Sequence, residues 1–424
     1  MILFAIGVYV AFALVNYRIA VLLLAPLSLF LHMFPVVDRQ MFSILDCCCL
    51  VLMALFPLKC RFVSKLKTYP FFIPSILVAL SFAITNVLAE SHWPSTVFVL
   101  STIYGFPFLV WSVIDDERDL KFLLYSYAVC FAFCVLYALV ELFFSENVVV
   151  VKLLEMGIVN PNVLNYAETR FGFKRLQSFF DTPMSMGLAV GTFGYLLFEY
   201  RKITKDGDLL IYFLMGGCFV LPWLTGSRAV FVAMIILVIP VLYDFMRENS
   251  SVLLKIALLG GAVFLLGDWI LTLVDSFVNS DSAVSGSSLD MRLMQLAVIL
   301  PFFFNSPIWG NGYAYTWTFV KAVDSDLLGA ESVWLQIPVD FGIVGMIAYV
   351  ACILYMAKKL SKCLGKRGAA MPLAVISAYS LSTFLGLELN YFFILCIIII
   401  KLYEYNKMRG DEEVRPRENI EENQ

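Results

Sequence analysis

The chain has 424 residues, of which 61% are apolar and only 15% are charged, and its formal net charge at neutral pH is −3. Soluble globular proteins are about 45–50% apolar and about 25% charged. This composition therefore excludes a soluble enzyme, a secreted disulfide scaffold and a nucleic-acid-binding protein, and it predicts an integral membrane protein.

Apolar stretches that suit transmembrane helices recur along the whole chain. A helix needs about 20 mostly apolar residues to cross a bilayer. Thirteen segments qualify, some of them short: residues 2–16, 19–35, 41–58, 70–88, 95–114, 122–144, 183–200, 209–224, 229–245, 252–274, 333–357, 370–387 and 390–404. We therefore expect an all-α, polytopic membrane protein with about 12–13 transmembrane helices in a single domain, residues 1–409.

The Lys and Arg residues are divided unequally between the two sets of connecting segments. One set, with the C-terminal tail, carries 22 of them and the other carries 8. Because basic loops stay in the cytosol, the C-terminus is predicted to be cytosolic, and its polar segment 410–424 is expected to be disordered. The opposite face carries two long segments, about 145–182 and 275–332, where we expect the functional residues.

The first long outer segment contains three cations within six residues: Arg170, Lys174 and Arg175. They could contact lipid phosphate or form a site for an anionic substrate. Arginine suits phosphate because its guanidinium donates two hydrogen bonds at once.

Arg228 follows the sequence Thr225-Gly-Ser, between the eighth and ninth predicted spans. At the start of a helix, the backbone amides and the guanidinium would point at one place, which makes an anion site. The alternative is an arginine that extends to the membrane surface.

Arg292 lies in a predicted helix start, where Ser287 and Asp290 have the spacing of a capping box. The alternative for Arg292 is simple surface exposure.

Two acids accompany the eleventh predicted span. Glu331 lies at its start, where the helix dipole stabilises a carboxylate, so helix capping and acid–base catalysis are both open. Asp340 lies deeper and either satisfies buried polar groups or marks a proton path. The histidines His32 and His92 have no partner at ligand spacing, so no metal site is predicted.

Four stretches resemble, in order, the O-antigen ligase and O-antigen polymerase superfamily of bacterial membrane glycosyltransferases. They are RLQSFFDTPMSMG from Arg175, TGSRAVFVA from Thr225, MRLMQLAVILPFFFNSPIWGNGYAY from Met291 and ESVWLQIPVDFGIVGMIAY from Glu331. The resemblance implies a C-type glycosyltransferase-like fold in the bacterial inner membrane. It also implies an inverting, metal-independent and cofactor-free transfer at the periplasmic face. Donor and acceptor would be oligosaccharides on undecaprenyl pyrophosphate.

The resemblance also assigns roles to single residues. Arg228 matches the family's Ser-Arg arginine at the outer end of a helix, and Arg292 matches the arginine ahead of the Gly-rich turn, so both are candidate catalytic residues. Arg175 matches an arginine often found before the seventh span. Ligases usually carry a histidine where this chain has Glu331, which favours the polymerase branch. The acceptor hydroxyl could need a base, for which Glu331 is the first candidate and Asp181 the second.

Three further expectations complete the functional hypothesis. Tyr313 could stack on sugars or be structural. The expected partners are membrane lipid, a flippase and a chain-length regulator, and no nucleic acid. Alternatives to a polymerase are a ligase that transfers glycan to lipid A core or to protein, and a transporter or flippase of the same cargo.

Overall fold

The computed structural model describes most of the chain. The residues described are 2–31, 33–36, 43–60, 62–89, 100–144, 146–159, 169–170, 173–205, 209–248, 289–316, 330–382 and 389–421, with the single residues 97, 267, 271, 319 and 323. Within them the helices are α1 (Ile2–Val15), α2 (Tyr17–Leu31), α3 (Ile44–Lys59), α4 (Phe62–Thr68), α5 (Phe72–Leu88), η1 (Ser101–Gly105), α7 (Phe106–Val113), α8 (Glu117–Phe144), α9 (Val148–Glu155), α10 (Pro183–Thr204), α11 (Leu209–Val220), η3 (Leu221–Thr225), α12 (Arg228–Glu248), α14 (Leu289–Asn305), α16 (Val333–Leu364), η4 (Gly365–Ala369), α17 (Ala370–Ser380) and α18 (Leu389–Glu421). Two-residue strands β1 (Thr169–Arg170) and β2 (Phe173–Lys174) pair antiparallel, with Thr169 opposite Lys174.

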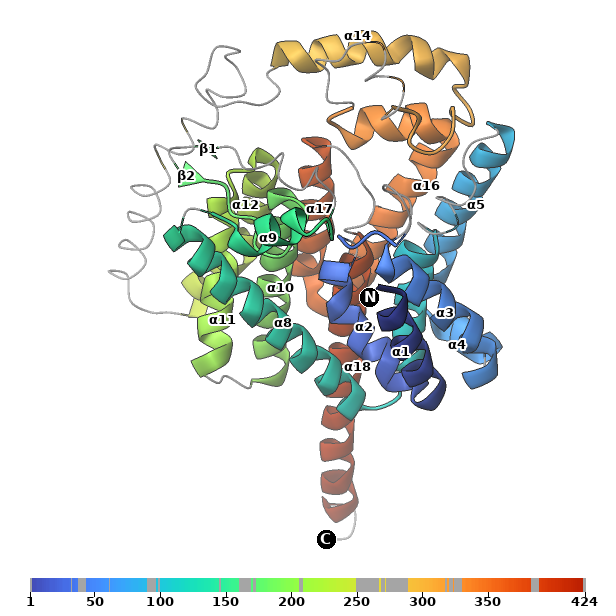
Figure 1. The fold of residues 1–424 in the computed structure, drawn as a ribbon. Coiled ribbons are helices and arrows are strands. Elements are labelled where there is room, and N and C mark those ends of the chain that lie inside the picture. Colours follow the sequence, from blue (N-terminus) through green and yellow to red (C-terminus); the bar gives the residue numbers. More distant parts are fainter. Residues whose placement is uncertain are drawn as a thin grey trace.

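The helical bundle confirms the all-α fold class (Figure 1). A described helix occupies each predicted span except 252–274, nearly all of which lies outside the described residues. Three of the described helices are long and apolar enough to cross a membrane, Glu117–Phe144, Arg228–Arg247 and Val333–Ser380, and several shorter apolar helices accompany them. Length and composition therefore agree with a membrane protein.

The C-terminal segment differs from its prediction. Helix α18 continues to Glu421, through most of the segment 410–424 that the sequence predicts to be disordered, and it projects from the bundle (Figure 1). The segment contains five Glu and two Arg residues, which are good helix formers, and it continues a helix that the apolar residues before it have already nucleated.

Helix α10 is buried along almost its whole length and lies at the centre of the half of the bundle that contains α11 and α12. Its glycines allow this packing. A Cβ built at Gly187 would lie 2.6 Å from a methyl group of Val230, and one at Gly191 would lie 2.4 Å from the sulfur of Met234. Both neighbours belong to α12, so the glycines bring the first turns of α12 against α10 and fix the position of Arg228.

Several polar groups within the apolar helices are paired with each other. Asp46 forms a capping box with Ser43 at the start of α3, and its other carboxylate oxygen accepts a hydrogen bond of 2.6 Å from Thr102 Oγ1. All ten cysteines are free, and most are buried among apolar side chains. These groups have structural roles, and none of them points to a reaction.

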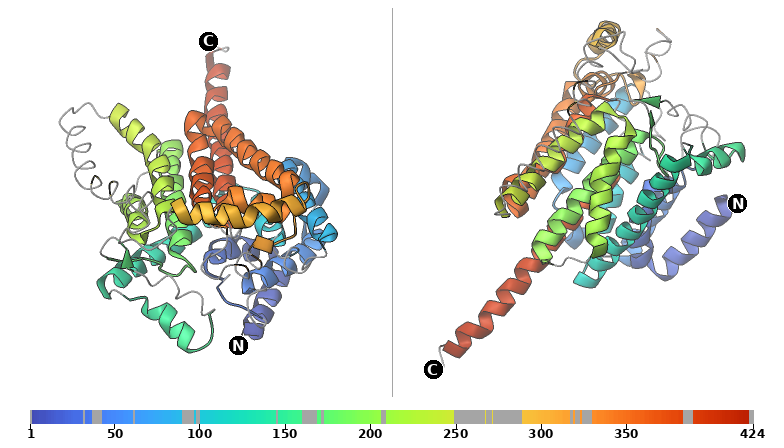
Figure 2. Two further views of the ribbon diagram at one scale, coloured as in Figure 1. Left: turned by 90° about the horizontal axis from the view of Figure 1, so that it is seen from above. Right: turned by 90° about the vertical axis from the view of Figure 1, so that its left-hand side faces the viewer.

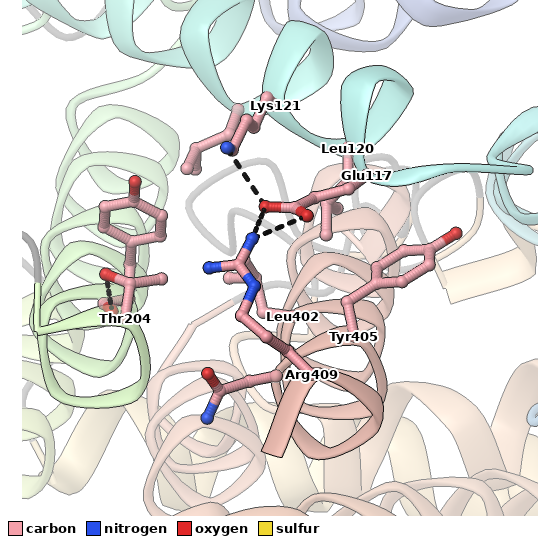
Figure 3. A pocket seen from close by; sticks show the side chains of 10 residues that line it. Glu117, Leu120, Lys121, Thr204, Leu402, Tyr405 and Arg409 are labelled. Carbon is pink, nitrogen blue, oxygen red and sulfur yellow. Dashed lines mark hydrogen bonds and ion pairs between the residues drawn. The ribbon is translucent and has the colours of Figure 1, made fainter. Parts of the chain in front are cut away.

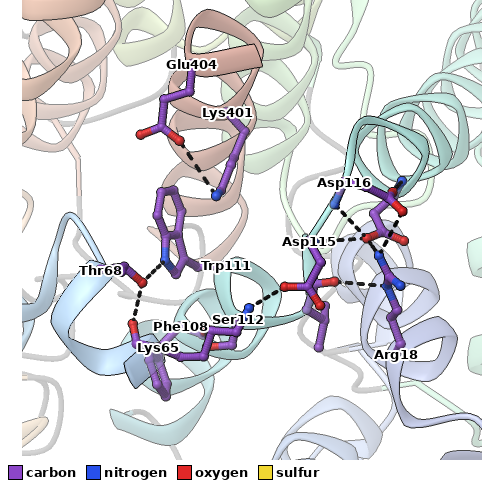
Figure 4. A network of polar contacts seen from close by, with 12 residues as sticks. Arg18, Lys65, Thr68, Phe108, Trp111, Ser112, Asp115, Asp116, Lys401 and Glu404 are labelled. Carbon is purple, nitrogen blue, oxygen red and sulfur yellow. Dashed lines mark hydrogen bonds and ion pairs between the residues drawn. The ribbon is translucent and has the colours of Figure 1, made fainter. Parts of the chain in front are cut away.

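Charged side chains gather at the end of the bundle from which α18 projects. Arg18 pairs with Asp116 and Asp119, and Lys65 pairs with Asp115, next to the ring of Trp111 (Figure 4). The Nζ atom of Lys401 lies 3.8 Å from the centroid of that ring. These lysines and arginines belong to the set that the sequence assigns to the cytosol.

A small pocket opens at the same end, between α8, α10 and α18 (Figure 3). Its carboxylate, Glu117, accepts hydrogen bonds from Arg409 at 2.7 and 2.8 Å and lies 3.0 Å from Lys121. The carboxylate and both basic side chains of this pocket are thus paired with one another.

The other end of the bundle carries β1, β2 and α14, which lies across the bundle (Figures 1 and 2).

Candidate functional site

Arg228 is placed by a tight turn between η3 and α12. Gly226 has a left-handed backbone, with φ of 61°, which glycine adopts without the steric cost that a side chain brings. The hydroxyl of Thr225 donates to Pro222 O at 2.7 Å and accepts from the amide of Ser227 at 3.4 Å. The turn therefore sets Arg228 as the first residue of α12, with only 7% of its surface exposed.

Arg175 lies against this same turn. Its Nε atom donates to Thr225 O at 3.1 Å, and the amide of the next residue, Leu176, donates to Leu224 O at 3.2 Å. Arg175 is also 7% exposed. The structure thus brings the segments of two predicted arginines together, from positions about 50 residues apart in the chain. Burial of two cations beside one helix start is expensive unless they have a function or strong partners.

A buried acid that was not predicted from the sequence holds the loop after Arg175. The carboxylate of Glu141, in α8, accepts the amides of Gln177 at 3.2 Å and Ser178 at 2.7 Å. Asn147 Nδ2 donates to Glu141 at 3.3 Å and to Ser178 O at 2.7 Å. Ser178 has a φ of 51°, which is unusual for a residue other than glycine. The only sequence signal for Glu141 is an acid inside a predicted span.

The remaining predicted residues of the first segment lie on either side of Arg175. Arg170 and Lys174 lie in the β1–β2 ladder just before it, and the side chain of Arg170 is outside the described part of the structure. Asp181 lies after it, where its carbonyl oxygen accepts a hydrogen bond of 2.9 Å from Gln177 Nε2. Asp181 directly precedes Thr182, the N-cap of α10.

The second group of predicted residues meets where α14 passes the start of α16. Arg292 Nη2 donates to Leu381 O at 2.9 Å, just after α17, and Nη1 lies 3.5 Å from Glu331 O. Burial lowers the pKa of the Arg292 guanidinium below its ordinary value, and the nearby Glu331 raises it. Arginine remains charged under any ordinary condition, so the two carbonyls hold a desolvated cation beside Glu331.

Gln295 completes this group, one turn after Arg292 on α14. It is fully buried, and its Oε1 atom accepts the amide of Glu331 at 3.2 Å. It is not among the residues predicted from the sequence. The spacing of three residues from Arg292 could have indicated it, because residues i and i+3 share a helix face.

The Gly-rich turn after α14 has a structural role. The amides of Asn311 and Gly312 donate to Val339 O and Asp340 O, both at 2.9 Å, where α16 is kinked at Gly342. A Cβ at Gly310 would lie 2.4 Å from Asp340 O, and one at Gly342 would lie 2.2 Å from Ile308 O. Two backbones therefore touch at glycines, and the turn clamps α14 to α16.

Asp340 and Tyr313 belong to this clamp. The buried carboxylate of Asp340 accepts both the amide and the hydroxyl of Thr316 at 2.9 Å, which supports the interpretation that it satisfies buried polar groups. The amide of Tyr313 donates to Asn86 Oδ1 at 2.8 Å, and its ring centroid lies 6.3 Å from that of Phe341. These contacts favour the structural interpretation of Tyr313 over a sugar-binding one.

Helix α17 lies between the two groups of arginines. Its C-terminal end receives the hydrogen bond from Arg292, and it packs along α12, whose first residue is Arg228. The two groups thus lie at the same end of the bundle, the end with α14 (Figure 1). Among the described residues, no three His, Cys, Asp or Glu side chains form a metal-binding group, and His32 and His92 lie outside them.

Comparison with known proteins bears on the second half of this site. Residues 211–350 match the family model of the O-antigen ligases. The predicted resemblance is confirmed for this part of the chain. The match contains Arg228, Arg292 and Glu331, whereas Arg175 and Asp181 precede it. No curated protein matches the sequence.

Proposed function

We propose that the protein is a glycosyltransferase of the bacterial inner membrane that polymerises oligosaccharide repeats carried on undecaprenyl pyrophosphate, for O-antigen or capsule. The active site would be the end of the bundle that carries α14, and this end would face the periplasm. The similarity of residues 211–350 to the O-antigen ligases supports the class of reaction. The unequal distribution of Lys and Arg supports the orientation.

The observation that carries the proposal is the anchoring of Arg292 beside Glu331. The Nη2 atom of Arg292 donates to Leu381 O, just after α17, at 2.9 Å, and its Nη1 atom lies 3.5 Å from the main-chain oxygen of Glu331. A fixed cation next to a residue that carries a carboxylate suits a transfer to a hydroxyl group, because the cation can stabilise the leaving group and the carboxylate can accept a proton.

The reaction would run as a single displacement. The acceptor hydroxyl attacks the anomeric carbon of the donor sugar, a new glycosidic bond forms, and the bond from that carbon to the pyrophosphate oxygen breaks. The hydroxyl proton passes to Glu331, with Asp181 as the second candidate. Pyrophosphate leaves as an anion, and its growing charge would be stabilised by Arg292 and by Arg228 at the start of α12.

Arg175, Arg170 and Lys174 would bind the pyrophosphate of the donor or the acceptor before reaction. The hydrogen bond from Arg175 to the turn before Arg228 supports a role for Arg175 near the same phosphate. Guanidinium groups suit this task because they are weakly hydrated and donate to two oxygens at once.

A ligase that transfers the glycan to lipid A core or to protein is the second candidate, supported by the family that residues 211–350 match. The glutamate at position 331, where ligases of the resembled superfamily usually carry a histidine, favours the polymerase. A flippase is the third. The contact of Arg175 with the turn before Arg228 and the contact of Arg292 with Glu331 both lie at one end of the bundle, whereas transporters bind their substrate near its middle.

Deletion of the gene in its bacterium separates the three functions, with the surface and lipid-linked glycans resolved on a gel. A polymerase deletion leaves one repeat unit on the acceptor. A ligase deletion leaves polymer on the lipid carrier, and a flippase deletion leaves repeats on the cytosolic leaflet. Either of the last two patterns would contradict a polymerase.

A further inference from the structure

The side-chain amide of Gln295 forms a hydrogen bond through its oxygen, but its nitrogen has no hydrogen-bond partner among the described residues. Its Oε1 atom accepts the amide of Glu331 at 3.2 Å. Its Nε2 atom is buried and has no hydrogen-bond partner among the described residues. A buried donor without a partner costs about 1–3 kcal/mol, so the retention of this amide inside an apolar helix calls for an explanation.

Arg292 shows the same pattern on the same helix face. Its two terminal nitrogens face carbonyl oxygens of Leu381 and Glu331, whereas its buried Nε atom has no partner among the described residues. Gln295 and Arg292 are three residues apart on α14, and each contacts the main chain of Glu331. Two buried N–H donors therefore lie around one residue, the candidate base.

We propose that Gln295 is a substrate-binding residue, and that its Nε2 atom and the Nε atom of Arg292 donate to oxygens of one phosphate group, the pyrophosphate of the lipid-linked donor. This inference rests on the proposed function and adds a residue to it. Both free groups are donors and one of them belongs to a cation, so the matching ligand is an anion that only accepts hydrogen bonds.

A sugar hydroxyl fits less well, because it would also need an acceptor for its own proton. Phosphate oxygens could come from undecaprenyl pyrophosphate or from a phospholipid headgroup. Glu331 lies beside these donors whichever phosphate binds. Only with the pyrophosphate of the donor would Glu331 also lie beside the bond that breaks.

Two variants separate substrate binding from a structural role. Gln295→Glu keeps the size of the side chain and an oxygen that can accept the amide of Glu331, but it replaces the Nε2 donor with an anionic oxygen. Gln295→Met removes both groups at nearly the same volume. Asn406→Asp makes the same chemical change as the first variant, at an exposed position near the other end of the bundle, and serves as the control.

Binding is measured with purified full-length protein in phosphatidylcholine nanodiscs, against undecaprenyl pyrophosphate and inorganic pyrophosphate. A second set of nanodiscs contains phosphatidylglycerol. The unfolding temperature of each variant shows that it is folded. We expect both Gln295 variants to bind undecaprenyl pyrophosphate at least about tenfold more weakly than the unmodified chain, which is the loss of one hydrogen bond to a charged group, and Asn406→Asp to bind normally.

Three results would overturn the inference. Normal affinity of Gln295→Glu with loss only in Gln295→Met would assign Gln295 to holding Glu331. Loss of phosphatidylglycerol binding alone would assign the donors to a lipid headgroup. Failure of the unmodified chain to bind either pyrophosphate would overturn the proposed function itself, which the first two results leave intact.

Discussion

Substitution of Arg292 by lysine tests the central argument, because it keeps the charge and removes the planar set of donors. In the structure one guanidinium reaches carbonyls on two segments, Leu381 O at 2.9 Å and Glu331 O at 3.5 Å. An ammonium group has no fixed geometry and no equivalent of the Nε atom. It can satisfy one carbonyl, but it cannot hold the α17 end and the α16 start together.

Two magnitudes follow from these contacts. Loss of the hydrogen bond from the charged group to Leu381 O costs about 1.5–3 kcal/mol of folding free energy at most, since lysine can recover part of it. Loss of one positioned donor to the leaving group costs about 10²–10³-fold in turnover. The effect on turnover should therefore be far larger than the effect on stability.

The assay uses purified protein in nanodiscs with a synthetic lipid-linked repeat, and it separates product lengths on a gel. We expect Arg292→Lys to lower kcat about 100-fold, with an unfolding temperature only a few degrees lower. Arg118→Lys, at an exposed position in the first turn of α8, is the matched control and should behave as the unmodified chain does. Turnover by Arg292→Lys within twofold of the control would refute a role for the guanidinium in the reaction.

The other predictions follow the same logic. Glu331→Gln removes the candidate base and should lower kcat at least about 100-fold while KM changes little; equal turnover would exclude Glu331 as the base. Glu141→Gln should lower the unfolding temperature. The side-chain oxygen of glutamine can still accept from the Ser178 amide, but it lacks the negative charge that strengthens this 2.7 Å hydrogen bond, and a hydrogen bond to a charged group contributes about 1.5–3 kcal/mol. An unchanged melting curve would contradict this. Gly342→Ala should destabilise the protein strongly, because the φ of Gly342 is 67° and a Cβ there would lie 2.2 Å from the backbone of the turn after α14. Gly216→Ala is the control and should be tolerated, because a Cβ there would meet nothing within 4 Å. Equal unfolding temperatures for the two variants would argue against the clamp.

The sequence by itself determined the class of the protein and the course of its helices. Apolar composition and span length depend only on residues near one another in the chain, so twelve of the thirteen predicted segments coincide with described helices. The position of Arg228 at a helix start followed from the same local signals, a Gly-Ser turn before an apolar run. The one clear difference is the helical continuation of α18 to Glu421.

The partners of the site residues were decided only by the tertiary structure. Arg175 meets Thr225 across about 50 residues, and Arg292 meets Leu381 across 89. No local pattern encodes such pairs, because they depend on which helices pack together. Gln295 shows the same limit: in the sequence it is one polar residue in an apolar helix, and only packing against the start of α16 leaves half of its amide engaged and the other half buried without a described partner.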